Sequence, residues 1–227
     1  EIPEKINLKK SILDISNGEF LNQTEGRTVS HMLYRDLSNS KNSHELKKIS
    51  NQREELSNFI KTIREVSDSH VDTIISISIG GSRLGPEFLS EAYANPYSKI
   101  KVYYCSSYDF IELENVMSVR NPARTLVVIS SKSFNTPEVI ENANKAKDWL
   151  ESLVGEHCWD QIIGISSNKE AMTEFGIEDA NQFETLDSVG GRYSIWSSIS
   201  LPAIVDMGWK GFEEFLGGAY EADKHFR

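Results

Sequence analysis

The sequence is short of cysteine and of metal-binding histidine patterns, and each shortage excludes a kind of site. Only two of the 227 residues are cysteines, Cys105 and Cys158, and neither belongs to a CxxC or Cys/His metal spacing. A chain of this length needs no disulfide to fold, so we expect both thiols to be reduced and packed in the interior. The five histidines show no HxxxH or HExxH spacing, and we therefore expect no metal site.

Long apolar runs and excess positive charge are missing too. No apolar run approaches the roughly 18 residues that span a bilayer, and the start, Glu1-Ile2-Pro3-Glu4-Lys5, has no signal-peptide core. We expect a cytoplasmic protein with no membrane partner. The 24 basic residues against 34 acidic ones leave a charge of −10, which argues against a nucleic-acid partner because phosphate-backbone binding requires clustered cations. An anionic ligand must then be small and held locally.

Residues 1–65 are polar and charged, and their apolar positions are spaced by threes and fours, as a surface helix requires. We therefore predict an N-terminal, mainly helical segment over residues 1–65. The apolar positions that carry this pattern are Leu46, Ile49, Leu56, Phe59, Ile60 and Ile63.

From about residue 73 the helical spacing of apolar residues gives way to short runs rich in β-branched residues. These runs lie at residues 73–79, 101–105, 126–130 and 161–165. Helix-like segments such as 86–94 and 137–153 lie between most of them. This alternation predicts an α/β domain over residues 66–227, a three-layer sandwich with a mainly parallel sheet covered by helices. We expect two C-terminal helices, over about 193–205 and 212–226, with a break at Gly208. Ligands bind beyond the carboxyl ends of such strands.

Three loops fall where that crevice should be. The first, Gly80-Gly81-Ser82-Arg83-Leu84-Gly85-Pro86, follows a strand, and we expect Pro86 at the first position of the next helix. Glycine amides, the Ser82 hydroxyl and a helix N-terminus could hold an anion. The loop is neither GxxxxGK[ST] nor GxGxxG, so nucleotide binding is disfavoured. A glycine turn without a ligand is the alternative.

The second loop, Ser131-Lys132-Ser133-Phe134-Asn135-Thr136-Pro137, also joins a predicted strand to a helix. Its three hydroxyls and one ammonium could wrap a phosphate monoester. The alternative is purely structural, because Thr136 followed by Pro137 is typical of a helix N-cap with proline at the next position.

The third loop, Val189-Gly190-Gly191-Arg192-Tyr193-Ser194, places a cation where a helix is expected to begin. Arg192 would oppose the helix dipole there unless an anion compensates. It could donate to a developing oxyanion, or it could bond to loop carbonyls or to an acid such as Asp187. Arg83 raises the same question.

Taken together and in this order, the three loops resemble the sugar-phosphate loops and signature of the glucose-6-phosphate isomerase (phosphoglucose isomerase) family, in the N-terminal portion with its first sugar-isomerase domain. The segments Thr24-Glu25-Gly26-Arg27, Phe175-Gly176-Ile177 and Phe215 through Phe226 resemble it too. The resemblance implies reversible isomerisation of glucose 6-phosphate and fructose 6-phosphate through an enediolate, in glycolysis and gluconeogenesis. It implies no metal or organic cofactor, and a homodimer in the complete protein.

Carried over position by position, the resemblance gives Arg192 the task of stabilising the enediolate. It gives the substrate phosphate to Gly81, Ser82, Ser131, Lys132, Ser133 and Thr136.

The chain also departs from the family pattern. The family usually has an acidic residue at Arg83, a threonine at Ser133, Thr-Thr at Asn135-Thr136 and Asp-Trp at Asp187-Ser188. Its proton-shuttling Glu and its ring-opening His and Lys belong to segments beyond Arg227. The end, His225-Phe226-Arg227, falls inside a predicted helix, which indicates a truncated chain, an incomplete sequence or a split domain. We expect this chain alone to be nearly inactive. A non-catalytic phosphosugar-binding module and, less favoured, a dinucleotide-binding fold are the alternatives.

Overall fold

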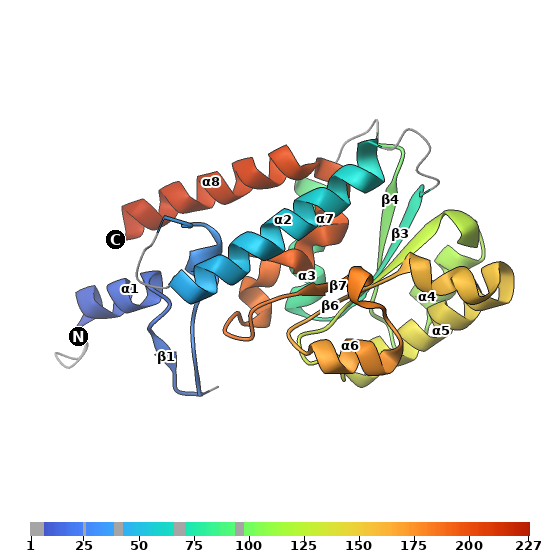
Figure 1. The fold of residues 1–227 in the computed structure, drawn as a ribbon, viewed down its shortest axis with the longest axis horizontal. Coiled ribbons are helices and arrows are strands. Elements are labelled where there is room, and N and C mark those ends of the chain that lie inside the picture. The colour runs from blue at the N-terminus through green and yellow to red at the C-terminus, as the bar shows by residue number, and fades with distance from the viewer. Residues whose placement is uncertain (1–6, 25, 39–42, 66–70, 94–97) are drawn as a thin grey trace.

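The computed structural model describes residues 7–24, 26–38, 43–65, 71–93 and 98–227, and the sequence features at Glu1–Lys5, Glu25 and His70 lie outside this part. Its centre is a parallel sheet, drawn as arrows in Figure 1. The five strands of this sheet lie in the order β4-β3-β5-β6-β7. The strands are β3 (Thr73–Ser78), β4 (Lys101–Cys105), β5 (Thr125–Ser130), β6 (Ile162–Ser166) and β7 (Gln182–Glu184).

The β-branched runs form four of these strands, which confirms the predicted parallel sheet. Strands β3, β5 and β6 are buried along their whole length, as expected where helices cover both faces. The fifth strand, β7, has only three residues, too few to show a periodic pattern in the sequence.

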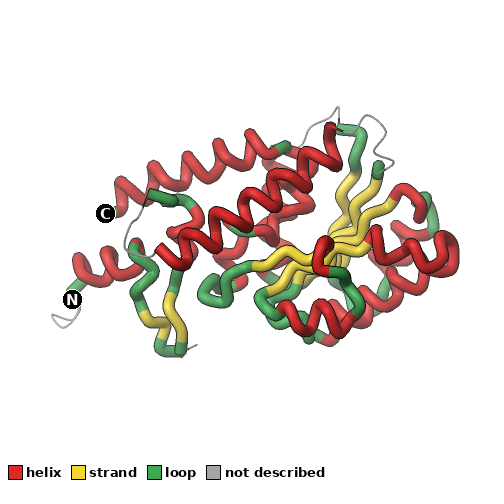
Figure 2. Tube along the Cα trace, viewed as in Figure 1, coloured by secondary structure: helices red, strands yellow, loops and turns green. Residues whose placement is uncertain are grey.

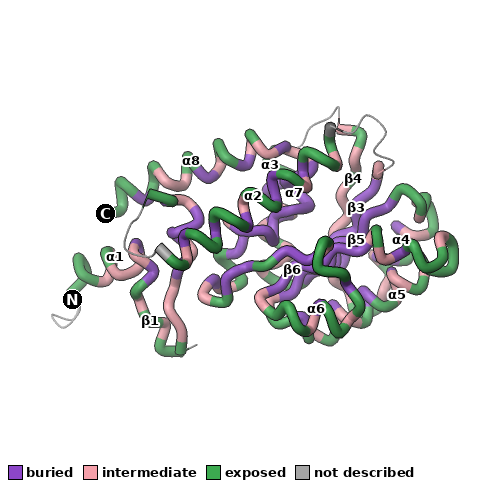
Figure 3. Tube along the Cα trace, viewed as in Figure 1, coloured by how far each residue is buried: buried purple, intermediate pink, exposed green. Residues whose placement is uncertain are grey.

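Helices cover both faces of the sheet, so the predicted three-layer α/β sandwich is confirmed (Figure 2). Successive residues of a strand point to opposite faces. Ile75 and Ile77 therefore join the core with α4 (Ile111–Met117), α5 (Pro137–Val154) and α6 (Lys169–Phe175). Ile74 and Val128 join the core on the other face, with α2 (Ser43–Glu65), α7 (Leu201–Met207) and α8 (Trp209–Phe226). Buried positions concentrate on the strands and on the inner sides of these helices (Figure 3).

The N-terminal segment is mainly helical, with α1 (Leu8–Ser16), a 3-10 turn at His31–Tyr34 and the long α2, but it also holds an unpredicted hairpin of β1 (Leu21–Asn22) and β2 (Arg27–Thr28). Helix α2 buries Leu56 and Ile60 in the same core as sheet residue Ile74. The predicted boundary between the N-terminal segment (residues 1–65) and the α/β domain (residues 66–227) stays a prediction.

The C-terminal prediction needs a correction, because residues 191–200 form two 3-10 turns, Gly191–Trp196 and Ser198–Ser200, instead of an α-helix. Serine hydroxyls bond to nearby carbonyls in this stretch: Ser194 to Gly191 at 2.8 Å and Ser197 to Ser194 at 2.7 Å. Such local bonds compete with α-helix formation. The predicted break at Gly208 is confirmed, with φ at 85° between α7 and α8.

The placement of Pro86 was wrong, since α3 (Gly81–Ala92) already begins at Gly81 and Pro86 lies inside it. Gly80 has φ at 59° and its carbonyl accepts from the Arg83 and Leu84 amides at 3.1 and 2.9 Å. The helix therefore starts directly after the strand.

Cys105 and Cys158 are free and buried, as predicted. Among the described residues, no helix is both long and apolar enough to cross a membrane. Other short 3-10 turns in the described ranges are Pro122–Arg124, Gly155–Gln161 and Asp179–Asn181.

Candidate active site

Two of the three predicted loops leave the sheet side by side. Strands β3 and β5 are paired neighbours, with Ser78 opposite Ser130 at their carboxyl ends. The loop from Gly80 follows β3 directly, and the loop from Ser131 follows β5. Because both strands run in the same direction, the two loops emerge at one edge of the sheet, where ligands of parallel sheets bind.

The first and third loops are in direct backbone contact. A Cβ atom added to Gly81 would lie 2.1 Å from the carbonyl oxygen of Gly191 and 2.7 Å from the amide nitrogen of Arg192. Only glycine permits this approach. Ser82 lies in the first turn of α3, next to this contact, and is half-buried.

The second loop is pinned from several sides. The Lys132 carbonyl accepts hydrogen bonds from the Ser166 and Ser167 hydroxyls at 2.9 and 2.8 Å. Phe134 has φ at 53° and is almost fully buried, so its side chain anchors a left-handed turn that is unusual for a non-glycine residue. The exposed Ser133 hydroxyl bonds to Asn135. Contacts within the chain thus support the shape of this loop.

Thr136 occupies the N-cap position of α5, with Pro137 following at the first helical position, as the structural alternative predicted. Its side chain makes no capping bond to the helix. The Thr136 hydroxyl instead lies 3.1 Å from the buried Ser131 hydroxyl. Capping alone therefore does not account for this threonine.

Arg192 is exposed on the 3-10 turn of the third loop. A short 3-10 turn has little aligned dipole, so the dipole argument made from the sequence for Arg192 is wrong. Within the described part of the chain, no carboxylate lies within ion-pair distance of its guanidinium. The acid that the sequence offered as its partner, Asp187, pairs instead with Arg27 at 2.5 Å and with Lys132 at 3.6 Å.

A cavity of about 180 Å³ lies between the third loop and the β1–β2 hairpin. Gly190, Gly191 and Arg192 line one side of it, and Arg27 and Asn22 line the other. Since two arginines face it, the cavity is suited to an anionic or strongly polar group.

The Arg83 guanidinium is engaged by neighbouring side chains and is not available to bind an anionic ligand. It pairs with Glu87 at 3.0 Å and Glu112 at 3.1 Å and also bonds to the Ser106 hydroxyl. The hydrogen bond to Glu87 raises the pKa of Arg83, against the effect of burial. Burial raises the pKa of Glu112, but the Ser106 amide and Arg83 outweigh it and hold that pKa below its usual value. The positive charge where the family usually has an acid is thus balanced locally.

Sequence reasoning missed the role of residues 27–35, which run beside the segment 187–196. Their contacts are Arg27 with Asp187, Ser30 with Ser188 at 2.5 Å, His31 stacked on Tyr193 at 4.5 Å, and Arg35 over Trp196 at 4.5 Å. The only signal in the sequence was the family resemblance of Thr24 through Arg27.

His31 is the member of this contact series that titrates. Burial, and then the nearby charge of Arg35, lower the pKa of His31 from 6.5 to about 4. The imidazole that stacks on Tyr193 is therefore neutral at neutral pH.

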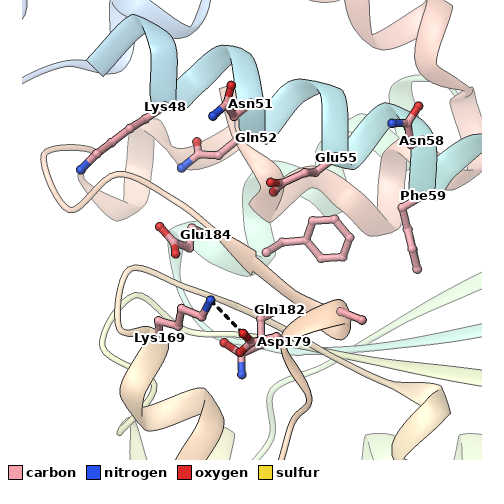
Figure 4. A pocket seen from close by; sticks show the side chains of 12 residues that line it. Lys48, Asn51, Gln52, Glu55, Asn58, Phe59, Lys169, Asp179, Gln182 and Glu184 are labelled. Carbon is pink, nitrogen blue, oxygen red and sulfur yellow. Dashed lines mark ion pairs between the residues drawn. The ribbon is translucent and has the colours of Figure 1, made fainter. Parts of the chain in front are cut away.

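A separate concavity of about 630 Å³ lies between α2 and β7, outside the three loops (Figure 4). Asn51, Gln52 and Glu55 line it from α2, and an ion pair of Lys169 with Asp179 lies across from them at 3.4 Å. None of the predicted site residues lines it. Among the described residues, no group of three or more His, Cys, Asp or Glu side chains is placed to hold a metal ion.

Comparison with known protein families shows to which family this chain belongs. The family model described as "Phosphoglucose isomerase" matches residues 1–227. The chain belongs to this family. Curated relatives named glucose-6-phosphate isomerase include those of Helicobacter pylori strain Shi470, 35% identical, and Helicobacter acinonychis strain Sheeba, 34% identical. Each alignment covers all of this chain and 44% of the relative, so the chain spans less than half the length of these family members.

Solved structures agree with this family. The glucose-6-phosphate isomerase of Chlamydia trachomatis superposes with a TM-score of 0.82 at 25% identity, over 95% of this chain and 43% of that one. A hypothetical protein from Thermus thermophilus shares the fold, with a TM-score of 0.64 at 20% identity over 95% of this chain and 47% of that one. The phosphoglucose isomerase fold is therefore shown, while the roles of individual loop residues stay predictions from the resemblance.

Proposed function

We propose that this chain carries the sugar-phosphate clamp and the oxyanion-stabilising arginine of a glucose-6-phosphate isomerase. Such an enzyme interconverts glucose 6-phosphate and fructose 6-phosphate through an enediolate. The observation that carries the proposal is the backbone contact of Gly81 with Gly191, because it joins the glycine loop to the loop of Arg192.

In this proposal the phosphate monoester lies over the loops that follow β3 and β5. Gly81 and Ser82 would donate from the start of α3, where backbone amides are unpaired and attract anions. Ser131, Ser133 and Thr136 would supply hydroxyls, and Lys132 would supply the positive charge. The contacts that hold the second loop within the chain would lower the entropic cost of capturing the phosphate.

Arg192 would act at the other end of the sugar. Removal of the proton from C2, or from C1 in the reverse direction, leaves negative charge on an oxygen of the enediolate until the other carbon is protonated. A guanidinium that pairs with no carboxylate of the described residues can stabilise that charge as it develops, and arginine stays protonated throughout.

The proton transfer itself needs an acid and a base. The family resemblance places its Glu, His and Lys in the part of the relatives that this chain does not span. We therefore propose that the chain alone binds the sugar phosphate but turns it over very slowly, since each positioned acid or base contributes roughly 10²–10⁴-fold. A homodimer of the complete protein remains a proposal by resemblance, and a cytoplasmic location remains a proposal from the sequence.

Calorimetric titration of the chain with fructose 6-phosphate tests the clamp. We expect binding that Lys132→Ala weakens by roughly tenfold, since the variant loses a charge-assisted bond of about 1.5 kcal/mol. Lys147→Ala, which removes a cation paired with Asp148 and Glu151 on α5, should bind as the wild type does. Tighter binding of NAD than of the sugar phosphate would overturn the proposal in favour of a dinucleotide fold.

A coupled assay of fructose 6-phosphate isomerisation tests whether the chain alone binds the sugar phosphate without turning it over. We expect little turnover from the chain alone. Turnover at the level of a complete family member would show that the acid and base lie within these 227 residues.

A further inference from the structure

Arg35 is held at the junction of three elements far apart in the sequence. It follows the 3-10 turn His31–Tyr34, and its guanidinium forms a two-point ion pair with Asp223 of α8 at 2.6 and 2.7 Å. Both side chains are about nine-tenths buried, with 8% and 10% exposed. The guanidinium carbon also lies 4.5 Å from the centre of the Trp196 ring.

Trp196 is the last residue of the 3-10 turn that carries Arg192. Its ring stacks on Phe215 of α8, with 4.8 Å between ring centres and 13° between planes. The turn is therefore fixed at both ends: Gly191 abuts Gly81 at the start, and Trp196 contacts Arg35 and Phe215 at the end.

We propose that Arg35 is a positioning residue for Arg192, acting through Trp196. This inference rests on the proposed function, in which the Arg192 guanidinium meets the enediolate. Arg35 itself contacts no substrate. Its part is to fix the Trp196 ring, and with it the turn from which the Arg192 side chain projects.

Two physical arguments support a positioning role. A 3-10 turn of six residues has weak hydrogen-bond geometry and holds its own shape poorly, so an exposed arginine on it needs support from outside. A buried ion pair is also a poor means of adding stability, because removing two charges from water offsets their attraction, and apolar residues of the same size often serve better. The Arg35–Asp223 pair supplies fixed geometry instead, since a planar guanidinium bound at two points has little freedom.

Two ligands that differ at C1 can separate the turn from the phosphate clamp. 6-Phosphogluconate carries a carboxylate at C1, where the enediolate charge would develop, and glucitol 6-phosphate carries a neutral hydroxyl there. Both have the same phosphate. The ratio of their affinities therefore reports on the placement of Arg192, while the affinity for glucitol 6-phosphate reports on the clamp.

The experiment measures this ratio by calorimetry for the chain and for matched variants. The wild type should prefer 6-phosphogluconate by roughly tenfold or more, as expected for hydrogen bonds to charged groups. Arg192→Ala should abolish the preference. Arg35→Lys, which keeps the charge but loses the planar fork, should reduce the preference severalfold with glucitol 6-phosphate binding unchanged. Trp196→Leu should do the same, and Trp196→Phe, which keeps a ring, should restore most of it.

Arg53→Lys is the matched control. Arg53 also pairs with an acid of α8, Glu213 at 3.5 Å, and lies over a tryptophan, Trp209 at 5.8 Å, but it does not support the turn. In Arg53→Lys the ratio of the affinities for 6-phosphogluconate and glucitol 6-phosphate should equal that of the wild type. If Arg35→Lys does not fold, Asp223→Asn, which keeps the shape and removes the charge, takes its place.

The outcomes separate the inference from the proposed function. A preference that is lost in Arg192→Ala but kept in folded Arg35→Lys and Trp196→Leu would overturn the positioning role alone. A preference that survives Arg192→Ala would overturn the oxyanion role of Arg192 and the inference with it. Equal losses of both ligands in Arg35→Lys would show a general structural role and would also contradict the inference.

Discussion

At the scale of the residue, Gly81 allows a direct test of the contact between the first and third loops. Gly81→Ala places a Cβ atom 2.1 Å from the Gly191 carbonyl oxygen, where only backbone could move away. We expect a loss of unfolding free energy of about 1–3 kcal/mol and weaker binding of fructose 6-phosphate. Urea denaturation and calorimetry measure the two effects.

Gly217→Ala is the control for that substitution, because Gly217 lies in α8 with open space around a new Cβ atom. It should leave stability unchanged or raise it by up to about 1 kcal/mol. If Gly81→Ala proves as stable and as active in binding as Gly217→Ala, the two loops do not meet as described.

His31 predicts a pH dependence of stability. Its pKa is about 4 in the folded chain, against 6.5 for the free group, so the unfolded chain binds the extra proton between these values. Stability is then highest above pH 6.5 and falls as the pH drops toward 4, by about 1.4 kcal/mol per pH unit at most. His31→Phe keeps a ring against Tyr193 and cannot titrate. The unfolding free energy of the wild type minus that of the variant should therefore fall steadily as the pH is lowered from neutrality toward the folded-state pKa. A pH-independent difference would contradict the assignment.

At the scale of the element, the sequence predicted the helices and strands whose apolar residues form a long or regular pattern. Four β-branched runs became strands, and the apolar spacing from Leu46 to Ile63 became α2. Strands of two or three residues, as in the β1–β2 hairpin and β7, have no room for a period. The sequence predicts a helix from about Tyr193, but the serine side chains of this stretch bond to the backbone and favour 3-10 turns.

We expect the packing of helix α2 against the sheet to contribute to the stability of the whole domain. Ile60 is almost fully buried and shares a core with Ile74 and Val128 of the sheet. Ile60→Ala should lower the unfolding free energy by about 2–5 kcal/mol, as large-to-small core substitutions do. Lys61→Ala, on the exposed side of the same helix, should change it by less than about 0.5 kcal/mol. A small effect of Ile60→Ala in urea denaturation would mean that residues 1–65 fold apart from the sheet.

At the scale of the whole molecule, the sequence predicted the three loops but not how they are joined. Their positions after strands placed the first two at one edge of the sheet, which follows from parallel topology. The approach of Gly81 to Gly191 and the support of Trp196 by Arg35 and Asp223 connect residues from distant parts of the chain. Contacts of that kind leave no periodic trace, since each depends on the packing of the complete chain.

If the proposed function holds, ligand binding should stabilise the molecule as a unit, because the proposed phosphate clamp draws on elements from both halves of the chain. Glucose 6-phosphate at about one hundred times its dissociation constant should add about 2.7 kcal/mol to the unfolding free energy. For a chain of this size that corresponds to a rise of roughly 5–10 °C in the melting temperature. Lys132→Ala at the same ligand concentration should show a smaller rise, and NAD should produce none in either protein. Equal shifts with glucose 6-phosphate in the wild type and in Lys132→Ala would place the phosphate away from the loop after β5, since a ligand stabilises the folded state only through the contacts it makes there.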